Sequence, residues 1–280
     1  MNVSQKAATA ATLTLATLGA QAGHVLVVLS DSDHLDLRDG KVFQTGFYLN
    51  ELMQPVKLLL DAGHTVAFAT PKGNAPTVDA SSVDKSYFDG DAAALQTHQA
   101  LLDKLQLTSR THSPVVSLSR VAQIGYDQFD AVYVPGGHAP MQDLLTSPEL
   151  GRLLTHFQSR GKTTALVCHG PIALLSALPD AKAFTQRLEA QASNPPQPAW
   201  PYAGYRMTVI SNEEEEQAKG YLGGGVMKFY PQTALQQAGG AYTSNKAPWT
   251  PHVVVDRELI TGQNPASAKG VAEELLHRLK

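Results

Sequence analysis

The stretch Ala165-Leu-Val-Cys168-His169-Gly170-Pro171 decides the fold. A short apolar run is typical of a buried strand, and here it leads directly into a turn marked by glycine and proline. Proline fits the first turn of a helix, and a glycine omits the side chain where strand and helix must nearly touch. This order predicts a strand–turn–helix unit that presents Cys168 at the end of the strand. Such a unit is a nucleophile elbow, with Cys in place of Ser.

Similar apolar runs alternate with helical patterns along the rest of the chain. Strands are expected at 24–30, 65–70, 130–135, 163–168, 207–211 and 252–256, and helices at 51–62, 92–105, 148–160, from about 171, and at 266–279. Strands that are apolar throughout are typical of parallel sheets covered on both sides. We therefore predict an α/β fold with a doubly wound, mostly parallel sheet and helices on both faces. In such sheets the chemistry gathers at the carboxyl ends of the strands.

Composition excludes several classes of protein. The chain has 280 residues, of which 43% are hydrophobic and 17% charged, so it is globular rather than disordered. Its net charge is −3 with no basic block, so we expect no nucleic-acid partner. One cysteine excludes a disulfide framework and any multi-cysteine metal site. The ten histidines form no tight pair such as His-x-x-x-His, so neither a metal nor another cofactor is expected.

Residues 1–22 have the pattern of a secretory signal peptide. Lys6 precedes an Ala-, Thr- and Leu-rich run, which ends in Ala20-Gln-Ala22, and no acid occurs before Asp31. The run is shorter than the roughly 20 apolar residues that a membrane span needs, so we expect no membrane partner. The pattern favours a periplasmic or secreted protein. The alternative is a cytoplasmic protein with a frayed N-terminal helix.

Residues 23–280 show no linker and are expected to form a single α/β domain. Within it, the segment 179–205 holds five prolines, and proline stiffens the chain and removes backbone donors. The second half of this segment is therefore expected to be irregular. Long loops in compact domains are often lids, so the segment is a candidate lid over the site. The alternative is a surface excursion that packs against a partner subunit.

The residue types around the predicted turn support covalent chemistry. A thiol beside a helix N-terminus is stabilised as the thiolate, which is the nucleophilic form. Cys168 is therefore the candidate nucleophile, although most single cysteines are small buried core residues. His169 is suited to relay protons at neutral pH and needs a carboxylate to orient its ring. The run Glu213–Glu216 follows an expected strand and offers one, although acidic runs usually form a solvated face.

Glu51 has two readings from the residues alone. It opens the helix expected at 51–62, where a carboxylate interacts favourably with the helix dipole. Buried beside a thiolate, the same acid would have a raised pKa because of desolvation and like charge. It could then donate or accept a proton during a reaction.

Four motifs in order resemble the ThiJ/PfpI superfamily over about residues 24–280. They are Thr45-Gly-Phe47 with Glu51, Pro135-Gly136-Gly137-His138, the elbow 165–171, and Pro248-Trp249 with Ile260–Ser267. The resemblance implies a flavodoxin-like fold and a homodimer. Within the superfamily, the chain is similar to the branch of glutathione-independent glyoxalases, known as glyoxalase III, and related heat-shock chaperones.

The resemblance also implies roles for individual residues. Cys168 corresponds to the nucleophile, His169 to its neighbouring histidine, and Glu51 to the carboxyl group against the sulfur. The third triad member aligns with Glu215, while a slip of one residue would select Glu214 or Glu216 instead. The implied substrate-binding residues are Gly136 and Gly137, whose backbone amides would face the substrate oxygen, together with His138 and Gly170.

The implied activity is cysteine-dependent conversion of a 2-oxoaldehyde such as methylglyoxal to a 2-hydroxy acid such as lactate, without metal or glutathione. Protein deglycation is a variant of this activity. Two other classes stay open. One is a stress chaperone or redox sensor without turnover, since an accessible low-pKa thiolate is easily oxidised. The other is a cysteine amidase or peptidase. A glutamine amidotransferase is disfavoured because Leu166 occupies the first glycine position of its elbow and no downstream His-x-Glu follows.

Overall fold

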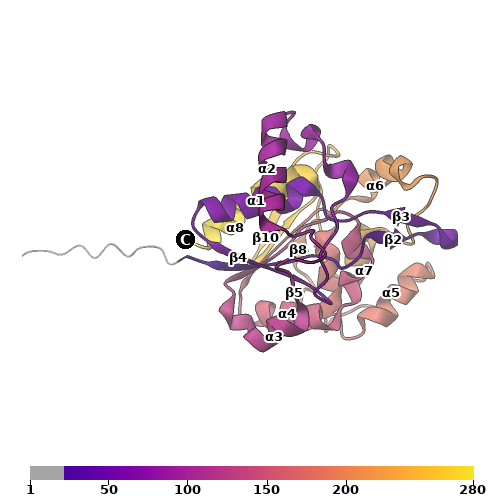
Figure 1. The fold of residues 1–280 in the computed structure, drawn as a ribbon. Helices are drawn as coiled ribbons and strands as arrows, with labels where there is room; N and C mark the ends of the chain where they lie inside the picture. The colour runs from indigo at the N-terminus through magenta and orange to yellow at the C-terminus, as the bar shows by residue number, and fades with distance from the viewer. Residues whose placement is uncertain (1–21) are drawn as a thin grey trace, which may run out of the picture.

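The computed structural model describes residues 22–280, which form a sheet covered by helices on both faces (Figure 1). From one edge to the other the seven strands are β10 (Val253–Asp256), β11 (Leu259–Gly262), β7 (Thr163–Val167), β6 (Ala131–Val134), β1 (His24–Val28), β4 (Thr65–Thr70) and β5 (Val116–Ser117). All neighbouring strands are parallel except β10 and β11, which pair antiparallel at the edge. The predicted doubly wound, mostly parallel sheet is confirmed.

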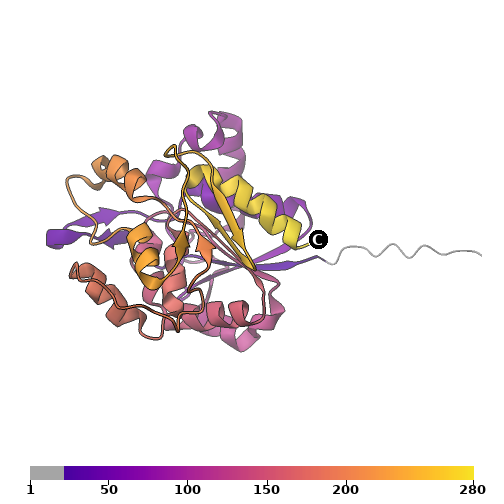
Figure 2. The same cartoon turned by 180° about the vertical axis from the view of Figure 1, so that it is seen from behind.

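The helices lie in two layers on opposite faces of this sheet. One layer holds α1 (Leu49–Asp61), α2 (Ala92–Leu105) and α8 (Ala268–Arg278), and the other holds α3 (Leu118–Ile124) and α4 (Pro148–Ser159) (Figures 1 and 2). Beyond the carboxyl ends of the strands lie the hairpin of β2 (His34–Asp36) and β3 (Val42–Gln44), with α5 (Ala181–Glu189), α6 (Asn212–Ala218) and α7 (Pro231–Ala238) (Figure 1). The chain therefore surrounds the strand ends with short elements.

The start of α1 sets the position of Glu51. The helix begins two residues before the predicted start, because the Ser82 hydroxyl accepts a hydrogen bond from the Leu49 amide at 2.9 Å. Glu51 thus lies in the first turn, inside the protein, rather than at a solvated helix end. An apolar face that includes Leu52, Val56 and Leu59 anchors the helix on the core.

Near the C-terminus, one predicted strand is shorter than expected and one strand was not predicted. The strand expected at 207–211 is reduced to β8 (Arg206–Met207), which pairs with β9 (Ala241–Tyr242) in a separate small sheet. Residues 208–211 instead run past the ends of β7 and β11, where the Ile210 amide donates to the Cys168 carbonyl at 3.0 Å. Strand β11 was not predicted, because it has only four residues and is directly followed by a polar turn.

The proline-rich segment 179–205, the candidate lid, contributes aromatic side chains to the core. Its first half forms α5, and its second half is irregular as expected. Two of its aromatic side chains are buried in the core, where Trp200 Nε1 donates to the Leu174 carbonyl at 2.8 Å and the Tyr202 hydroxyl donates to a carbonyl of α4. The prolines stiffen a segment that packs beneath the elbow helix, and none of its residues lines the cavity that contains Cys168.

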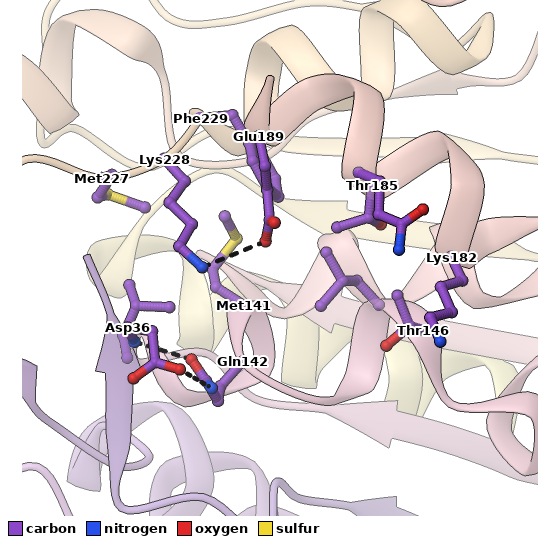
Figure 3. A pocket seen from close by; sticks show the side chains of 13 residues that line it. Asp36, Met141, Gln142, Thr146, Lys182, Thr185, Glu189, Met227, Lys228 and Phe229 are labelled. Atoms are coloured by element: carbon purple, nitrogen blue, oxygen red, sulfur yellow. Dashed lines mark hydrogen bonds and ion pairs between the residues drawn. The ribbon is translucent and has the colours of Figure 1, made fainter. Parts of the chain in front are cut away.

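Helix α5 lines a different cavity, of about 240 Å³, with β2 and residues 227–229 (Figure 3). Lys228 and Glu189 form an ion pair across it at 3.5 Å, and Gln142 hydrogen-bonds Asp36 on the opposite wall (Figure 3). Its lining residues include neither a cysteine nor a histidine.

The expected signal peptide, residues 1–22, falls almost entirely outside the described residues. Within 22–280, no helix is both long enough and apolar enough to cross a membrane.

Candidate active site

A cavity of about 810 Å³ opens at the carboxyl ends of the strands and contains Cys168. Its walls come from segments that are far apart in the sequence. They include β3, the start of α1, the loop 77–89, the elbow, α6 and the loop around Trp249. The sheet thus brings together the site at its carboxyl edge, as predicted for a doubly wound fold.

The predicted strand–turn–helix unit is present at Cys168. β7 ends at Val167, Cys168 has a left-handed φ of 60°, and the 3₁₀ helix η7 (Gly170–Ala177) follows. A left-handed φ in a residue other than glycine is strained, and such strain is typical of elbows that project a side chain from a sheet. A Cβ on Gly170 would lie 2.4 Å from the Val134 carbonyl oxygen, which explains the glycine after His169. Gly170 therefore shapes the turn and does not line the cavity.

His169 connects the sulfur to a carboxylate. Its Nδ1 lies 3.4 Å from Cys168 Sγ, and its Nε2 lies 2.6 Å from Glu215 Oε1. All three side chains are at least 97% buried, yet all three line the cavity. The order of these three side chains matches that of a nucleophile, a base and an orienting carboxylate.

The start of α6 determines which glutamate faces His169. Ser211 caps the helix in a capping box with Glu214. The two oxygens of the Glu214 carboxylate accept hydrogen bonds from the backbone amides of Ser211 and Trp249. Glu216 points outward and pairs with Lys219 at 3.1 Å. Glu215 lies between them on the buried face and alone contacts His169. Of the three alternatives that the sequence left open, the structure places Glu215 against His169.

Burial and charge set the protonation states of this pair. Burial lowers the pKa of His169, helped by the neighbouring His138, so the ring is neutral at neutral pH. Burial alone would raise the pKa of Glu215, but the two imidazoles His169 and His138 outweigh it and hold this pKa well below its usual range. Since the ionised Glu215 carboxylate accepts a hydrogen bond from Nε2–H, the neutral ring has Nδ1 free to accept the thiol proton.

Glu51 lies against the sulfur from the side of α1. It is fully buried, and its Oε2 accepts a hydrogen bond from the Gly136 amide at 2.7 Å. Burial raises the pKa of Glu51 to about 8, so the carboxyl group keeps its proton at neutral pH. This confirms the reading of Glu51 as a buried acid rather than a solvated helix-dipole residue.

The structure does not support the predicted resting thiolate. Burial of the sulfur raises the pKa of Cys168 well above its ordinary value. The first turn of a short 3₁₀ helix does not offset this desolvation. Cys168 therefore rests as a thiol, with Nδ1 of His169 as a nitrogen within hydrogen-bond distance of its sulfur.

The first of the two loop glycines, Gly136, does not present a free amide, contrary to the prediction. The Gly136 amide is bound by Glu51, so it is not available to a substrate oxygen. A Cβ on Gly136 would lie 2.8 Å from the Cys168 Cβ, and one on Gly137, whose φ is 85°, would lie 2.0 Å from the Gly46 carbonyl oxygen. The glycines are needed because backbone and side chains pack so closely here.

His138 is part of a cluster that sequence reasoning missed. Its ring stacks on His169 with centroids 4.1 Å apart, and its Nε2 lies 3.7 Å from Glu215 Oε2. Its Nδ1 is buried without a hydrogen-bond partner. The two histidines follow β6 and β7, which are adjacent and in register, with Val134 opposite Leu166. Knowledge that β6 and β7 are neighbours would have predicted the cluster, but the spacing of the two histidines along the chain does not show it.

The cavity mouth is aromatic and carries charges of both signs. Its wall includes Phe43, Tyr48, Tyr87, Tyr221 and Trp249 among the aromatic residues, and Asp33, Asp79, Asp89 and Arg110 among the charged ones. Trp249 has a left-handed φ of 65°, and its amide donates to Glu214 at 2.7 Å. The volume of about 810 Å³ gives this cavity room for a group much larger than a three-carbon aldehyde.

Replacing Glu215 by Gln is expected to lower kcat about 100-fold on a carbonyl substrate, because a neutral amide stabilises the imidazolium less well than a carboxylate does. KM should change little, since the substitution preserves the shape of the side chain. The matched control is Glu216→Gln in the next, exposed position of α6, which should keep wild-type kcat. Equal losses in the two variants would rule out Glu215 as the orienting carboxylate.

Comparisons with known proteins agree with this fold. A family model described as ThiJ/PfpI family-like matches residues 42–224, well over half of the chain. The protein/nucleic acid deglycase HchA of Staphylococcus aureus is 26% identical over 248 residues, which are 87% of this chain and 75% of the relative. Two solved structures have similar folds. The rapid encystment protein of Francisella tularensis (TM-score 0.69, 22% identity) and glyoxalase III of Candida albicans (TM-score 0.67, 20% identity) each align with 92% of this chain, and with 99% and 98% of their own chains.

Proposed function

The chain belongs to the ThiJ/PfpI family, and on that premise we propose that it converts a 2-oxoaldehyde such as methylglyoxal to a 2-hydroxy acid such as lactate. The observation that carries the proposal is the position of Cys168 between two different proton carriers. A neutral imidazole backed by Glu215 lies on one side of the sulfur, and a protonated Glu51 lies on the other.

The relatives support the general class of reaction. HchA is named as a protein/nucleic acid deglycase, and one solved structure of similar fold is named as a glyoxalase. Both names describe reactions of small reactive carbonyl compounds or of their adducts. Adducts on a protein or a nucleic acid are therefore further candidate substrates. A nucleobase adduct that enters the cavity needs no basic stripe, so the net charge of −3 argues only against tight binding of a nucleic-acid backbone.

The first step is attack by sulfur on the aldehyde carbon, C1. Nδ1 of His169 takes the thiol proton, and the new S–C1 bond converts the aldehyde oxygen into an alkoxide. Glu51 protonates this oxygen, which yields a hemithioacetal. Because C1 is one bond from the sulfur, a carboxyl group that contacts the sulfur is within reach of the groups on C1. The amide of His169, the residue after the nucleophile, is placed to stabilise the developing charge.

The second step moves hydrogen from C1 to C2. The Glu51 carboxylate takes the C1 proton, and the His169 imidazolium protonates the C2 oxygen, which gives an enediol. Glu51 then returns the proton to C2 while His169 takes the proton from the C1 oxygen. The product is a 2-hydroxy thioester on Cys168. C1 is oxidised by the two electrons that reduce C2, so the step needs no external oxidant or reductant.

The last step is hydrolysis of the thioester. Water loses a proton to the Glu51 carboxylate and adds to C1, and His169 protonates the departing sulfur. The thiol, the neutral imidazole and the protonated Glu51 are restored. General acid–base assistance of this kind contributes roughly 10²–10⁴-fold to a rate.

The test is a product assay on the wild-type chain with a panel of methylglyoxal, a glycated amino acid, simple amides and a peptide mixture, followed by proton NMR. We expect methylglyoxal to be replaced by an equal amount of lactate in buffer without glutathione. Ammonia from the amides, or cleaved peptides without lactate, would instead identify a cysteine amidase or peptidase. Inertness to the whole panel, with suppression of client aggregation that survives in Cys168→Ala, would favour a chaperone.

A further inference from the structure

We propose that His138, His169 and Glu215 form a binding site for one divalent first-row transition metal ion such as Zn²⁺. Each residue offers one ligand atom, and these three atoms lie within 4.8 Å of one another. Two imidazoles and a carboxylate are a donor set that suits such ions, whereas Mg²⁺ and Ca²⁺ prefer oxygen ligands alone.

The cluster is accessible to an ion although its members are buried. All three side chains line the 810 Å³ cavity, so an ion can enter through the mouth and keep a water molecule in a fourth position on the cavity side. Zinc sites with three protein ligands and one open position are of this kind.

His138 has little to lose when it binds an ion. Its Nε2 is 3.7 Å from Glu215 Oε2, which is beyond a normal hydrogen bond, and its Nδ1 has no partner. The ring of Phe43 contacts this imidazole edge-on, with ring centroids 5.2 Å apart, and the ring of His169 lies against it with centroids 4.1 Å apart. A buried imidazole without a strong hydrogen bond is a free ligand, already positioned opposite the carboxylate.

Occupancy of this site has a consequence for His169. The nitrogen that binds the ion is Nε2, which now donates to Glu215 at 2.6 Å. When an ion replaces that proton, the neutral ring carries its remaining proton on Nδ1, 3.4 Å from Cys168 Sγ. A protonated Nδ1 cannot accept the thiol proton. The bound ion therefore prevents activation of Cys168. This inhibition rests on the proposed function, whereas the binding itself does not.

The position of Cys168 allows an experiment to distinguish an ion bound by His138, His169 and Glu215 from an ion bound by the thiol. The sulfur faces the opposite nitrogen of the His169 ring, so it does not ligate an ion held by Nε2. Cys168→Ala should therefore leave the ion site in place. Phe43→Leu is the matched control for a residue that contacts His138 without offering a ligand.

The experiment is calorimetric titration of the full chain with ZnCl₂ in a non-chelating buffer, with MgCl₂ as the control ion. We expect one Zn²⁺ per chain, wild-type affinity in Cys168→Ala and Phe43→Leu, no binding of Mg²⁺, and affinity weakened by about 100-fold or more in His138→Gln. Glu215→Gln provides a second variant should His138→Gln fail to give a cooperative thermal transition. No binding to wild type, equal binding in both ligand variants, or binding lost in Cys168→Ala would overturn the proposal.

A turnover measurement separates this proposal from the proposed function. Zn²⁺ should inhibit lactate formation by wild type, and EDTA should restore it. If the chain forms no lactate, the proposed function fails, but the calorimetric result still decides the metal site. If lactate forms and Zn²⁺ does not bind, only the metal proposal fails.

Discussion

Cys168→Ala is expected to lower kcat/KM for methylglyoxal by about 10⁵-fold, which is the scale of loss when a covalent nucleophile is removed. No other residue can replace the sulfur, because Cys168 is the single cysteine of the chain. His169, Glu215 and Glu51 remain in place but have no atom to which C1 can bond. The measurement is lactate formation followed by NMR at equal concentrations of variant and wild type.

The fold should survive this substitution. Alanine removes only the sulfur from a side chain that is 2% exposed, and its Cβ adopts the left-handed φ of the elbow with about the same strain as cysteine. We expect the midpoint of thermal unfolding to change by a few degrees at most, which a calorimetric scan checks. Wild-type turnover by a folded Cys168→Ala would show that the sulfur is not the nucleophile.

Glu51→Gln is expected to lower kcat about 10³-fold while making the protein more stable. Glutamine can still accept the Gly136 amide hydrogen bond, so the elbow keeps its shape. It cannot take the proton from C1 or return it to C2, and general acid–base catalysis is worth roughly 10²–10⁴-fold. Asp61→Asn, on the exposed end of the same helix, is the control and should keep wild-type kcat.

The stability of Glu51→Gln should depend on pH in a specific direction. The folded-state pKa of Glu51 is raised to about 8 from an ordinary value of 4.5, so the folded state binds this proton more tightly than the unfolded state does. The contribution of Glu51 to the free energy of unfolding of wild type is therefore fully present below pH 4.5 and is lost as pH rises through 8. The free energy of unfolding of the variant should match that of wild type near pH 4.5, exceed it by a few kcal/mol near pH 8, and run parallel to it above. A difference that does not change with pH would show that Glu51 is ionised in the folded protein.

The elbow was predictable because its chemistry is local. A strand, a nucleophile, a small residue and a proline follow one another within 165–171, and each has a backbone reason to be there. Gly170 is the clearest case, since only a missing side chain lets the turn pass the Val134 carbonyl. The doubly wound, mostly parallel sheet was predictable as well, because continuously apolar strands require helices on both faces of a sheet.

The rest of the site depends on contacts between segments that are distant in the sequence. The pairing of His138 with His169 follows from the order of β6 and β7, which no spacing along the chain encodes. Burial raises the pKa of Cys168, and a local argument from the helix dipole does not include that burial. Likewise, the composition of the proline-rich segment is typical of a loop, but Trp200 and Tyr202 are buried and donate hydrogen bonds to carbonyl groups of other elements.

The most direct test of the central claim is the mass of the peptide that contains Cys168, taken by rapid acid quench of wild type during turnover of methylglyoxal. Acid preserves a thioester, so the account predicts that this peptide gains the mass of one methylglyoxal molecule, and that the gain disappears when the substrate is exhausted. An unmodified Cys168 peptide while lactate accumulates would contradict the account.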